Sequence, residues 1–172
     1  MKTVYWLMPA EPARSFFAAQ IDALAREYDA PVFAPHVTLC ATPAGLENPA
    51  AVLRRALVGA EPVRLRVRGI DCSDAFTKTV FVQFQESPRL AEWTRTLRDA
   101  SGCPDEDAIN PHLSLLYRQM PLARKQKIAD TIILPFAEVV FDSVQAVRCG
   151  AEVQTRADVE SWRAVATQSL PA

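Results

Sequence analysis

Two short stretches of the chain share a pattern that contains both of its histidines. The first is Pro35-His36-Val37-Thr38-Leu39, and the second is Pro111-His112-Leu113-Ser114-Leu115. In each stretch a proline precedes the histidine, and a hydroxyl residue follows it two positions later. A single His-x-Thr is common in strands, but a duplicated pattern that includes every histidine of the chain indicates a shared function.

The alternation of apolar and polar residues in both motifs predicts β-strands. Successive side chains of a strand point to opposite faces, so each imidazole lies beside its hydroxyl group. One imidazole can take a proton from water while the other donates a proton to a leaving oxygen. The hydroxyl groups of Thr38 and Ser114 can bind non-bridging phosphate oxygens. The motifs therefore predict phosphodiester hydrolysis, and a cyclic phosphate suits them because its leaving alkoxide stays tethered.

Two other interpretations of the histidines stay open. A pair of non-catalytic histidines at strand edges would give the same pattern. A metal site with two histidines would lack the third protein ligand that zinc sites use. The sequence has no cluster of Asp and His residues at metal-binding spacing, so we expect neither a metal ion nor another cofactor.

Other reactive residues are weaker candidates. Lys78 either faces the groove or begins a solvated strand end. The alternating arginines of residues 64–68 fit an anionic substrate and an exposed polar face equally well. Cys103 would need a lowered thiol pKa to react, and the acidic residues 105–107 predict a solvated loop.

The spacing of apolar and turn-forming residues predicts the elements that carry the motifs. Helices are expected near residues 13–28, 48–58, 87–100 and 121–132, and a functional loop near 101–109. Strands are expected near residues 3–8, 35–39, 63–72, 78–85, 111–117, 137–149 and 159–168. The order β-α-β-α-β-β-α-β-α-β-β, with hairpin-like neighbours, favours an α+β fold with antiparallel sheets over a doubly wound one.

Composition narrows the class of protein. The chain has 172 residues, of which 49% are hydrophobic and 23% charged, which fits one globular domain and excludes a disordered chain. No apolar run approaches the roughly 20 residues that span a bilayer, and no secretory signal is evident. The four cysteines are therefore expected as free thiols in the cytoplasm. A net charge of -1 favours a small substrate over long nucleic acid, and we expect a monomer.

At these motifs the sequence resembles the two-histidine phosphoesterase superfamily, and within it the cyclic phosphodiesterases of plants and yeast. The similar stretches are residues 5–9, 33–39, 111–117 and 160–166, so the resemblance spans most of the chain. It implies a bilobal LigT-like fold in which residues 1–172 form one domain of two pseudo-symmetric lobes. Each lobe would be an antiparallel sheet with outer helices, and the motifs would line a central groove.

The resemblance also implies an activity. It implies hydrolysis of ADP-ribose 1'',2''-cyclic phosphate to ADP-ribose 1''-phosphate, and of nucleoside 2',3'-cyclic phosphates to 2'-phosphates. His112 would be the base that activates water, and His36 the acid for the leaving oxygen. The remaining site residues would be Thr38 and Ser114 on the phosphate, and Trp6 and Tyr117 lining the pocket. The two aromatic rings either stack on a base or ribose or pack in the core.

Two alternative functions are kept. One is an RNA-end enzyme of the same superfamily, similar to the bacterial and archaeal 2'-5' RNA ligases. The other is a non-catalytic nucleotide-binding module, which would need the hydroxyls and aromatic rings but not both imidazoles.

Overall fold

The protein folds from strands and helices in nearly the predicted order. The computed structural model describes residues 1–43, 45, 48–102 and 109–171. Seven strands form within these ranges: β1 (Lys2–Pro9), β2 (Val37–Pro43), β3 (Val63–Cys72), β4 (Val80–Phe84), β5 (His112–Leu116), β6 (Glu138–Cys149) and β7 (Arg163–Ser169). The described helices are α1 (Ala13–Tyr28), α2 (Pro49–Ala56), α3 (Pro88–Ser101), α4 (Leu122–Thr131) and α5 (Arg156–Glu160), with a 3-10 turn η1 (Phe76–Lys78). The α+β prediction is confirmed.

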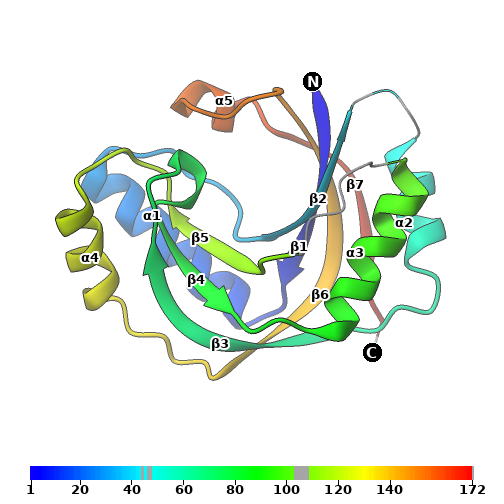
Figure 1. The fold of residues 1–172 in the computed structure, drawn as a ribbon, viewed down its shortest axis with the longest axis horizontal. Coiled ribbons are helices and arrows are strands. Elements are labelled where there is room, and N and C mark those ends of the chain that lie inside the picture. Colours follow the sequence, from blue (N-terminus) through cyan, green and yellow to red (C-terminus); the bar gives the residue numbers. More distant parts are fainter. Residues whose placement is uncertain (44, 46–47, 103–108, 172) are drawn as a thin grey trace.

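The strands form one antiparallel sheet in the order β1-β2-β5-β4-β3-β6-β7, and β1 also pairs with β6. The long strand β6 joins two halves of this sheet, because its residues 138–141 pair with β3 and residues 141–149 pair with β1. On the other side, β2 meets β5 where Val37 pairs with Leu113. The two expected sheets are thus hydrogen-bonded into one strongly curved sheet (Figure 1). This closure makes the two motif strands neighbours.

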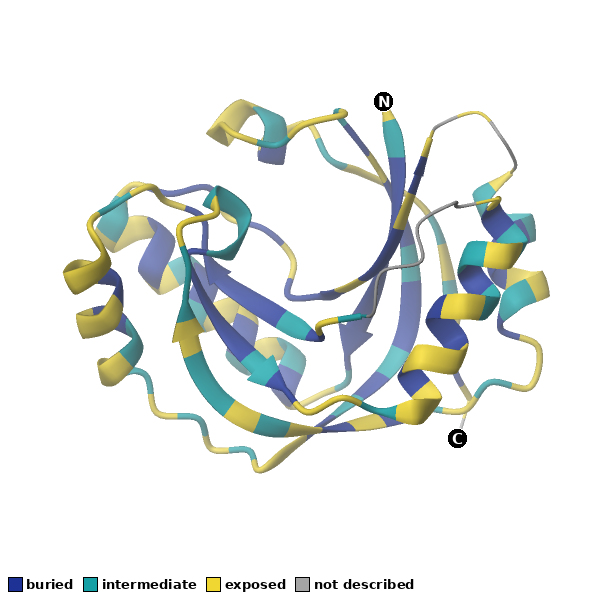
Figure 2. Ribbon diagram, in the orientation of Figure 1, coloured by how far each residue is buried: buried dark blue, intermediate teal, exposed yellow. Residues whose placement is uncertain are grey.

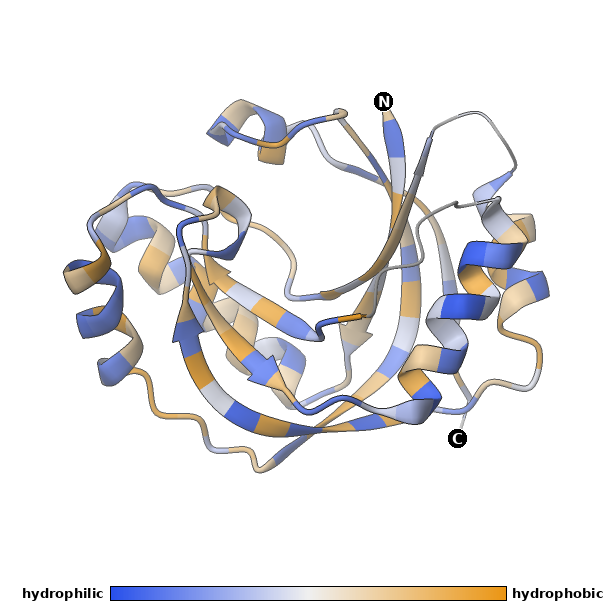
Figure 3. Ribbon diagram, in the orientation of Figure 1, coloured by the Kyte–Doolittle hydropathy of each residue, from blue (hydrophilic) through white to orange (hydrophobic). Residues whose placement is uncertain are grey.

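Helices cover the outside of the curved sheet (Figure 1). Helices α1 and α4 pack against β5 and β3, while α2 and α3 pack against β7 and β2. Each helix has an apolar face that explains its place; in α1 the buried side chains include Phe17, Ile21 and Leu24, which recur at helical spacing. The hydropathy pattern of Figure 3 shows polar residues on the outer faces of α2 and α3. The described helices α1 to α4 thus pack on the outside of the sheet.

Strand β1 is buried on both faces. Tyr5 and Leu7 belong to the main core, whereas Val4 and Trp6 pack in a smaller cluster with Cys149 and other residues of β6 on the concave side. Figure 2 shows β1 as dark blue along most of its length. Burial on two faces explains why the strand is an unbroken apolar run rather than an alternating one.

Strand β3 decides between the two interpretations of its arginines. Val63 and Leu65 are buried, while the three arginines of residues 64–68 are exposed. The blue and orange alternation of β3 in Figure 3 follows this pattern. The arginines form an exposed polar face and do not line the cavity on the concave side.

Three element boundaries differ from the prediction. Strand β2 begins at Val37 rather than at residue 35, and β4 begins at Val80 because Lys78 lies in η1. Helix α5 occupies the start of the last predicted strand. Its signal is a capping box, in which Thr155 accepts from the Asp158 backbone and the Asp158 carboxylate accepts from the Thr155 backbone. The division into two pseudo-symmetric lobes stays a prediction.

Candidate active site

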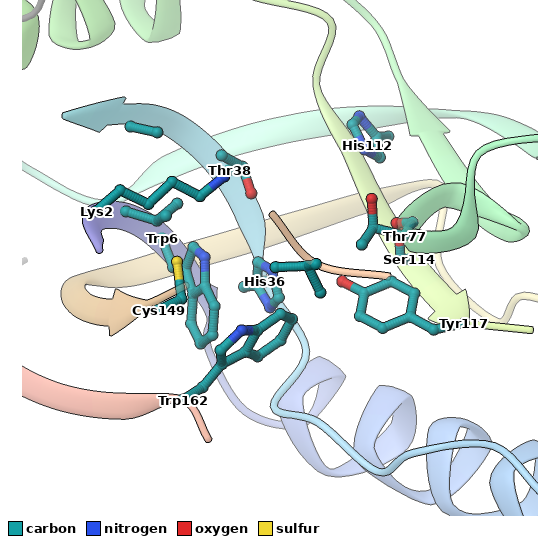
Figure 4. Close-up of a pocket in the computed structure, with 13 residues that line it drawn as sticks. Lys2, Trp6, His36, Thr38, Thr77, His112, Ser114, Tyr117, Cys149 and Trp162 are labelled. Atoms are coloured by element: carbon teal, nitrogen blue, oxygen red, sulfur yellow. The ribbon is translucent and has the colours of Figure 1, made fainter. Parts of the chain in front are cut away.

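A cavity of about 330 Å³ opens on the concave side of the sheet (Figure 4). Its volume lies near the lower end of the range for small-molecule sites. All six residues predicted for the site line it, together with seven others: the predicted set is Trp6, His36, Thr38, His112, Ser114 and Tyr117, and the additional residues are Lys2, Val4, Ala41, Thr77, Cys149, Val153 and Trp162. The fold thus brings both motifs to one pocket.

The two imidazoles are held in the same way. The Nδ1 atom of His36 lies 2.7 Å from the carbonyl oxygen of Ala34, and the Nδ1 atom of His112 lies 2.8 Å from that of Asn110. A carbonyl oxygen can only accept, so each Nδ1 carries the proton and Nε2 is left to exchange a proton with a ligand. Figure 4 shows the two rings on different sides of the pocket.

The proline of each motif contributes to this arrangement. It separates the histidine from the carbonyl that holds it, at Pro35 and Pro111. A proline restricts the residue before it to extended backbone, and its fixed φ limits how the chain can turn between carbonyl and imidazole. The proline before each histidine therefore helps to orient the imidazole.

His36 is buried among aromatic rings. Its ring stacks on Trp6, with centroids 3.8 Å apart and planes at 14°, and it meets the edges of Phe33 and Trp162. Burial lowers the pKa of His36 from 6.5 to about 4; the hydrogen bond to Ala34 acts in the opposite direction and the nearby His112 in the same one. His36 is therefore neutral in the empty pocket at pH 7.

His112 is less enclosed. Its ring lies edge-on to Phe81, with centroids 5.5 Å apart, and the Lys78 ammonium lies 4.3 Å from the centre of the Phe81 ring. Burial lowers the pKa of His112, and the positive charge of Lys78 lowers it further. Lys78 thus lies beside the His112 environment, although it does not line the cavity itself.

The two aromatic residues predicted to contact substrate each stack on another ring of the protein. One face of Trp6 is covered by His36, and the ring of Tyr117 stacks on Phe33 at a centroid distance of 3.8 Å. Burial raises the pKa of the Tyr117 hydroxyl, while a hydrogen bond with Ser114 opposes that rise. Tyr117 therefore offers the pocket a neutral hydroxyl group, and Trp6 fixes the plane of an imidazole.

The two motif hydroxyls are not equivalent. Thr38 is exposed to the cavity, whereas Ser114 is buried and its Oγ donates to the carbonyl oxygen of Thr77 at 2.8 Å. Thr77 lies in η1, which the sequence did not predict. Because a serine hydroxyl has one proton, Ser114 must release the Thr77 carbonyl before it can donate to a phosphate.

Hydrogen bonds from Lys125 and Thr79 hold the segment that contains Thr77. The buried ammonium of Lys125 donates to the Ser73 carbonyl at 2.7 Å and to the Asp74 carboxylate at 2.9 Å. Thr79 is also buried, and its Oγ1 lies 3.0 and 3.1 Å from the carbonyl oxygens of Phe76 and Arg118, either of which can accept its one proton. These bonds position the carbonyl that receives Ser114.

Sequence reasoning missed several lining residues. Trp162 lies 5.1 Å from Trp6 and 6.0 Å from Tyr117 between ring centroids, so it closes an aromatic wall. Its place in the similar stretch 160–166 was the available signal. Lys2 also lines the pocket, and its alternation with Val4 and Trp6 was the signal for it. Cys103 and the acidic residues 105–107 lie outside the described residues.

The described residues contain neither a metal-binding cluster nor a membrane-spanning helix. Across residues 1–43, 45, 48–102 and 109–171, no three His, Cys, Asp or Glu side chains gather as metal-ion ligands. In those same ranges, no helix combines the length and apolarity needed to cross a bilayer.

Comparison with known proteins gives the family. The model of the 2'-5' RNA ligase superfamily matches residues 9–150, which include both histidine motifs. The chain belongs to this superfamily. The resemblance to two-histidine phosphoesterases, stated from the motifs alone, is confirmed.

The chain is also similar to other proteins over nearly its whole length. A protein of Arabidopsis thaliana named "Cyclic phosphodiesterase" is 26% identical over 175 residues, covering 98% of this chain and 96% of its own. The structure of E. coli LigT in apo form has a TM-score of 0.60 at 17% identity, covering 99% of this chain and 98% of LigT. The protein TT0787 of Thermus thermophilus has a TM-score of 0.55 at 19% identity, with the same coverage. These structures establish the LigT-like fold.

Proposed function

We propose that the pocket hydrolyses small cyclic phosphodiesters by general acid and base catalysis at His112 and His36, without a metal ion. The observation that supports this most directly is the matched pair of imidazoles, each held through Nδ1 by a backbone carbonyl two residues earlier. That arrangement leaves two Nε2 atoms available to one cavity. A proton donor and a proton acceptor on different sides of a phosphorus atom are what hydrolysis of a phosphodiester requires.

The proposed steps balance in atoms and charge. Nε2 of His112 accepts a proton from water as the water oxygen bonds to phosphorus. The bond from phosphorus to one ring oxygen breaks, and Nε2–H of His36 donates its proton to that oxygen. The products are an opened phosphate monoester and a hydroxyl group, with the proton transferred from one histidine to the other.

The electrostatics of the pocket suit these roles. His36 must be protonated when substrate is bound, and a phosphate anion beside it favours the imidazolium form. Burial lowers the pKa of His36 in the empty pocket, and the bound anion opposes that shift, so the ring can hold a proton and then donate it to the leaving alkoxide. Thr38 and Ser114 would donate to the non-bridging oxygens and hold the phosphorus between the two rings.

The substrates proposed are ADP-ribose 1'',2''-cyclic phosphate and nucleoside 2',3'-cyclic phosphates. For the latter, opening to a 2'-phosphate means that His36 protonates the 3'-oxygen. Supporting this, the Arabidopsis thaliana relative is named a cyclic phosphodiesterase, and E. coli LigT has been crystallised with 3'-AMP. The cavity is the size of a small ligand rather than of a duplex.

A second candidate is processing of a cyclic phosphate at an RNA end. The superfamily takes its description from 2'-5' RNA ligases, which favours this possibility. The net charge of -1 provides no basic surplus for a long RNA, so only the terminal nucleotides would be held. We also infer a monomer in the cytoplasm; support comes from a pocket lined within one chain and from Cys72 and Cys149 as free thiols among the described residues.

The test is phosphorus NMR of products from a panel of cyclic phosphates, which reports both substrate preference and the bond that breaks. Replacing either histidine by alanine is expected to lower turnover by several orders of magnitude, while the protein stays folded. Lys127→Met, on the exposed face of α4, serves as the matched control and keeps full activity. A His112→Ala variant that retains nearly full hydrolysis would show that the mechanism is wrong.

A further inference from the structure

Lys2 places a positive charge in the wall of the active-site pocket. The side chains of Lys2, Val4 and Trp6 all line the cavity, as residues on one face of a strand must. Figure 4 shows the Lys2 side chain extending from β1 toward Thr38, on the side of the pocket away from His112. Its backbone is paired with both neighbouring strands, opposite Pro43 of β2 and Cys149 of β6. The sheet therefore fixes the backbone from which this ammonium reaches the pocket.

Among the described residues, no carboxylate pairs with this charge. None of the cavity-lining residues is an Asp or Glu, and no ion pair joins Lys2 to a carboxylate in the part of the chain that the structure describes. The other polar side chains of the wall are hydroxyls, the Cys149 thiol, the indole N–H groups of two tryptophans and the two imidazoles proposed to act on the reacting phosphate. An ammonium group that faces such a cavity attracts an anionic group of the ligand.

We propose that Lys2 binds a second phosphate of the substrate, on the 5'-oxygen of the ribose that bears the cyclic phosphate. This rests on the proposed function, because the cyclic phosphate itself must lie between His36 and His112. Lys2 belongs to the opposite end of the pocket from His112, Ser114 and Thr77 (Figure 4). A ribose whose cyclic phosphate is held between the imidazoles can therefore direct its 5'-substituent toward β1 and Lys2.

Two kinds of substrate share this chemistry. In ADP-ribose 1'',2''-cyclic phosphate the 5''-oxygen of the same ribose carries a diphosphate. In an RNA ending in a 2',3'-cyclic phosphate the 5'-oxygen carries a phosphodiester. A simple nucleoside 2',3'-cyclic phosphate has only a 5'-hydroxyl group. Substrates with a phosphate at this oxygen are therefore expected to be preferred over nucleoside cyclic phosphates that have a 5'-hydroxyl group.

The experiment measures kcat/KM on adenosine 2',3'-cyclic phosphate with a 5'-hydroxyl and with a 5'-phosphate. The wild-type protein is expected to prefer the 5'-phosphate by about tenfold, mostly through KM, as one charge-assisted contact provides. Lys2→Met should remove this preference and Lys2→Arg should keep it. Lys127→Met, which removes one positive charge far from the pocket, should leave the preference unchanged. The preference should also weaken as salt is added.

A comparison of further substrates identifies the molecule that supplies the second phosphate, and three other outcomes would refute the proposals. A dinucleotide with a terminal cyclic phosphate is compared with ADP-ribose 1'',2''-cyclic phosphate, and the one whose rate depends more on Lys2 identifies the source. An equal loss on both adenosine substrates in Lys2→Met would mean that Lys2 touches the reacting phosphate or only supports the strand, and the proposal would be wrong. Equal kcat/KM values of the wild-type protein on the 5'-hydroxyl and 5'-phosphate substrates would also refute the role of Lys2. A wild-type protein that hydrolyses no cyclic phosphate overturns the proposed function.

Discussion

The burial of His36 predicts a specific loss of stability in acid. The folded protein buries this imidazole against Trp6, and burial lowers the pKa of His36 from 6.5 to about 4. In the unfolded chain the imidazole regains its ordinary pKa. Between these two values the unfolded state binds a proton that the folded state does not, so the free energy of unfolding decreases as the pH falls.

The size of the effect follows from the two pKa values. Each pH unit in this window costs about 1.4 kcal/mol, so lowering the pH from 7 to near 4 removes about 3 kcal/mol through His36 alone. His36 is 7% exposed, so solvent screens little of this cost. His36→Gln removes the titrating group and should lose less stability than the wild-type protein over the same range.

Urea unfolding followed by tryptophan fluorescence, at several pH values between 7 and 4, measures the difference. Carboxylates titrate in both proteins and cancel when the two curves are subtracted. His112→Gln is the comparison, and its difference from wild type should be smaller because that imidazole is less buried. If wild type and His36→Gln lose stability in parallel from pH 6.5 to 4, the burial argument for His36 is refuted.

Three further results are expected. The value of kcat/KM should be highest below pH 6.5 and fall about tenfold per pH unit at higher pH, because the free enzyme then lacks an imidazolium acid; a rate that rises toward pH 8 would contradict the two-histidine mechanism. Lys125→Met should lower the free energy of unfolding by about 1–3 kcal/mol in urea titrations, since it removes the donor that the Ser73 carbonyl accepts from. The exposed Lys127→Met should change it by less than about 0.5 kcal/mol. Thr38→Ala should cost about 10²-fold in kcat/KM on a cyclic phosphate, as the loss of one positioned donor does, with an unchanged melting temperature; full activity would exclude Thr38 from phosphate binding.

Much of the fold was predictable because its signals are local. Proline and asparagine or serine caps mark the starts of α2 and α3, and apolar spacing marks the buried face of α1. Helix α5 was missed although its capping box is also local, since the following strand pattern suggested a longer strand. The joining of two expected sheets into one depends on β6 pairing with both β3 and β1, a non-local contact with no sequence signature.

The sequence by itself determined which residues carry the chemistry. A duplicated pattern containing both histidines is visible without coordinates, and strand periodicity places an imidazole beside a hydroxyl in each copy. The family follows from the same residues. Strand periodicity, however, is a property of a single strand, so it does not predict which strands lie side by side or which of their faces line a common pocket.

Only the tertiary structure decided what surrounds each of these groups. Packing against Trp6 makes one histidine a buried neutral ring, and the Thr77 carbonyl engages one of the two motif hydroxyls. It also places Lys2, which looks like an ordinary charged start of a strand, on the wall of the pocket. Desolvation, hydrogen-bond partners and charge proximity all depend on distances between segments far apart in the chain, and those distances exist only once the sheet has closed.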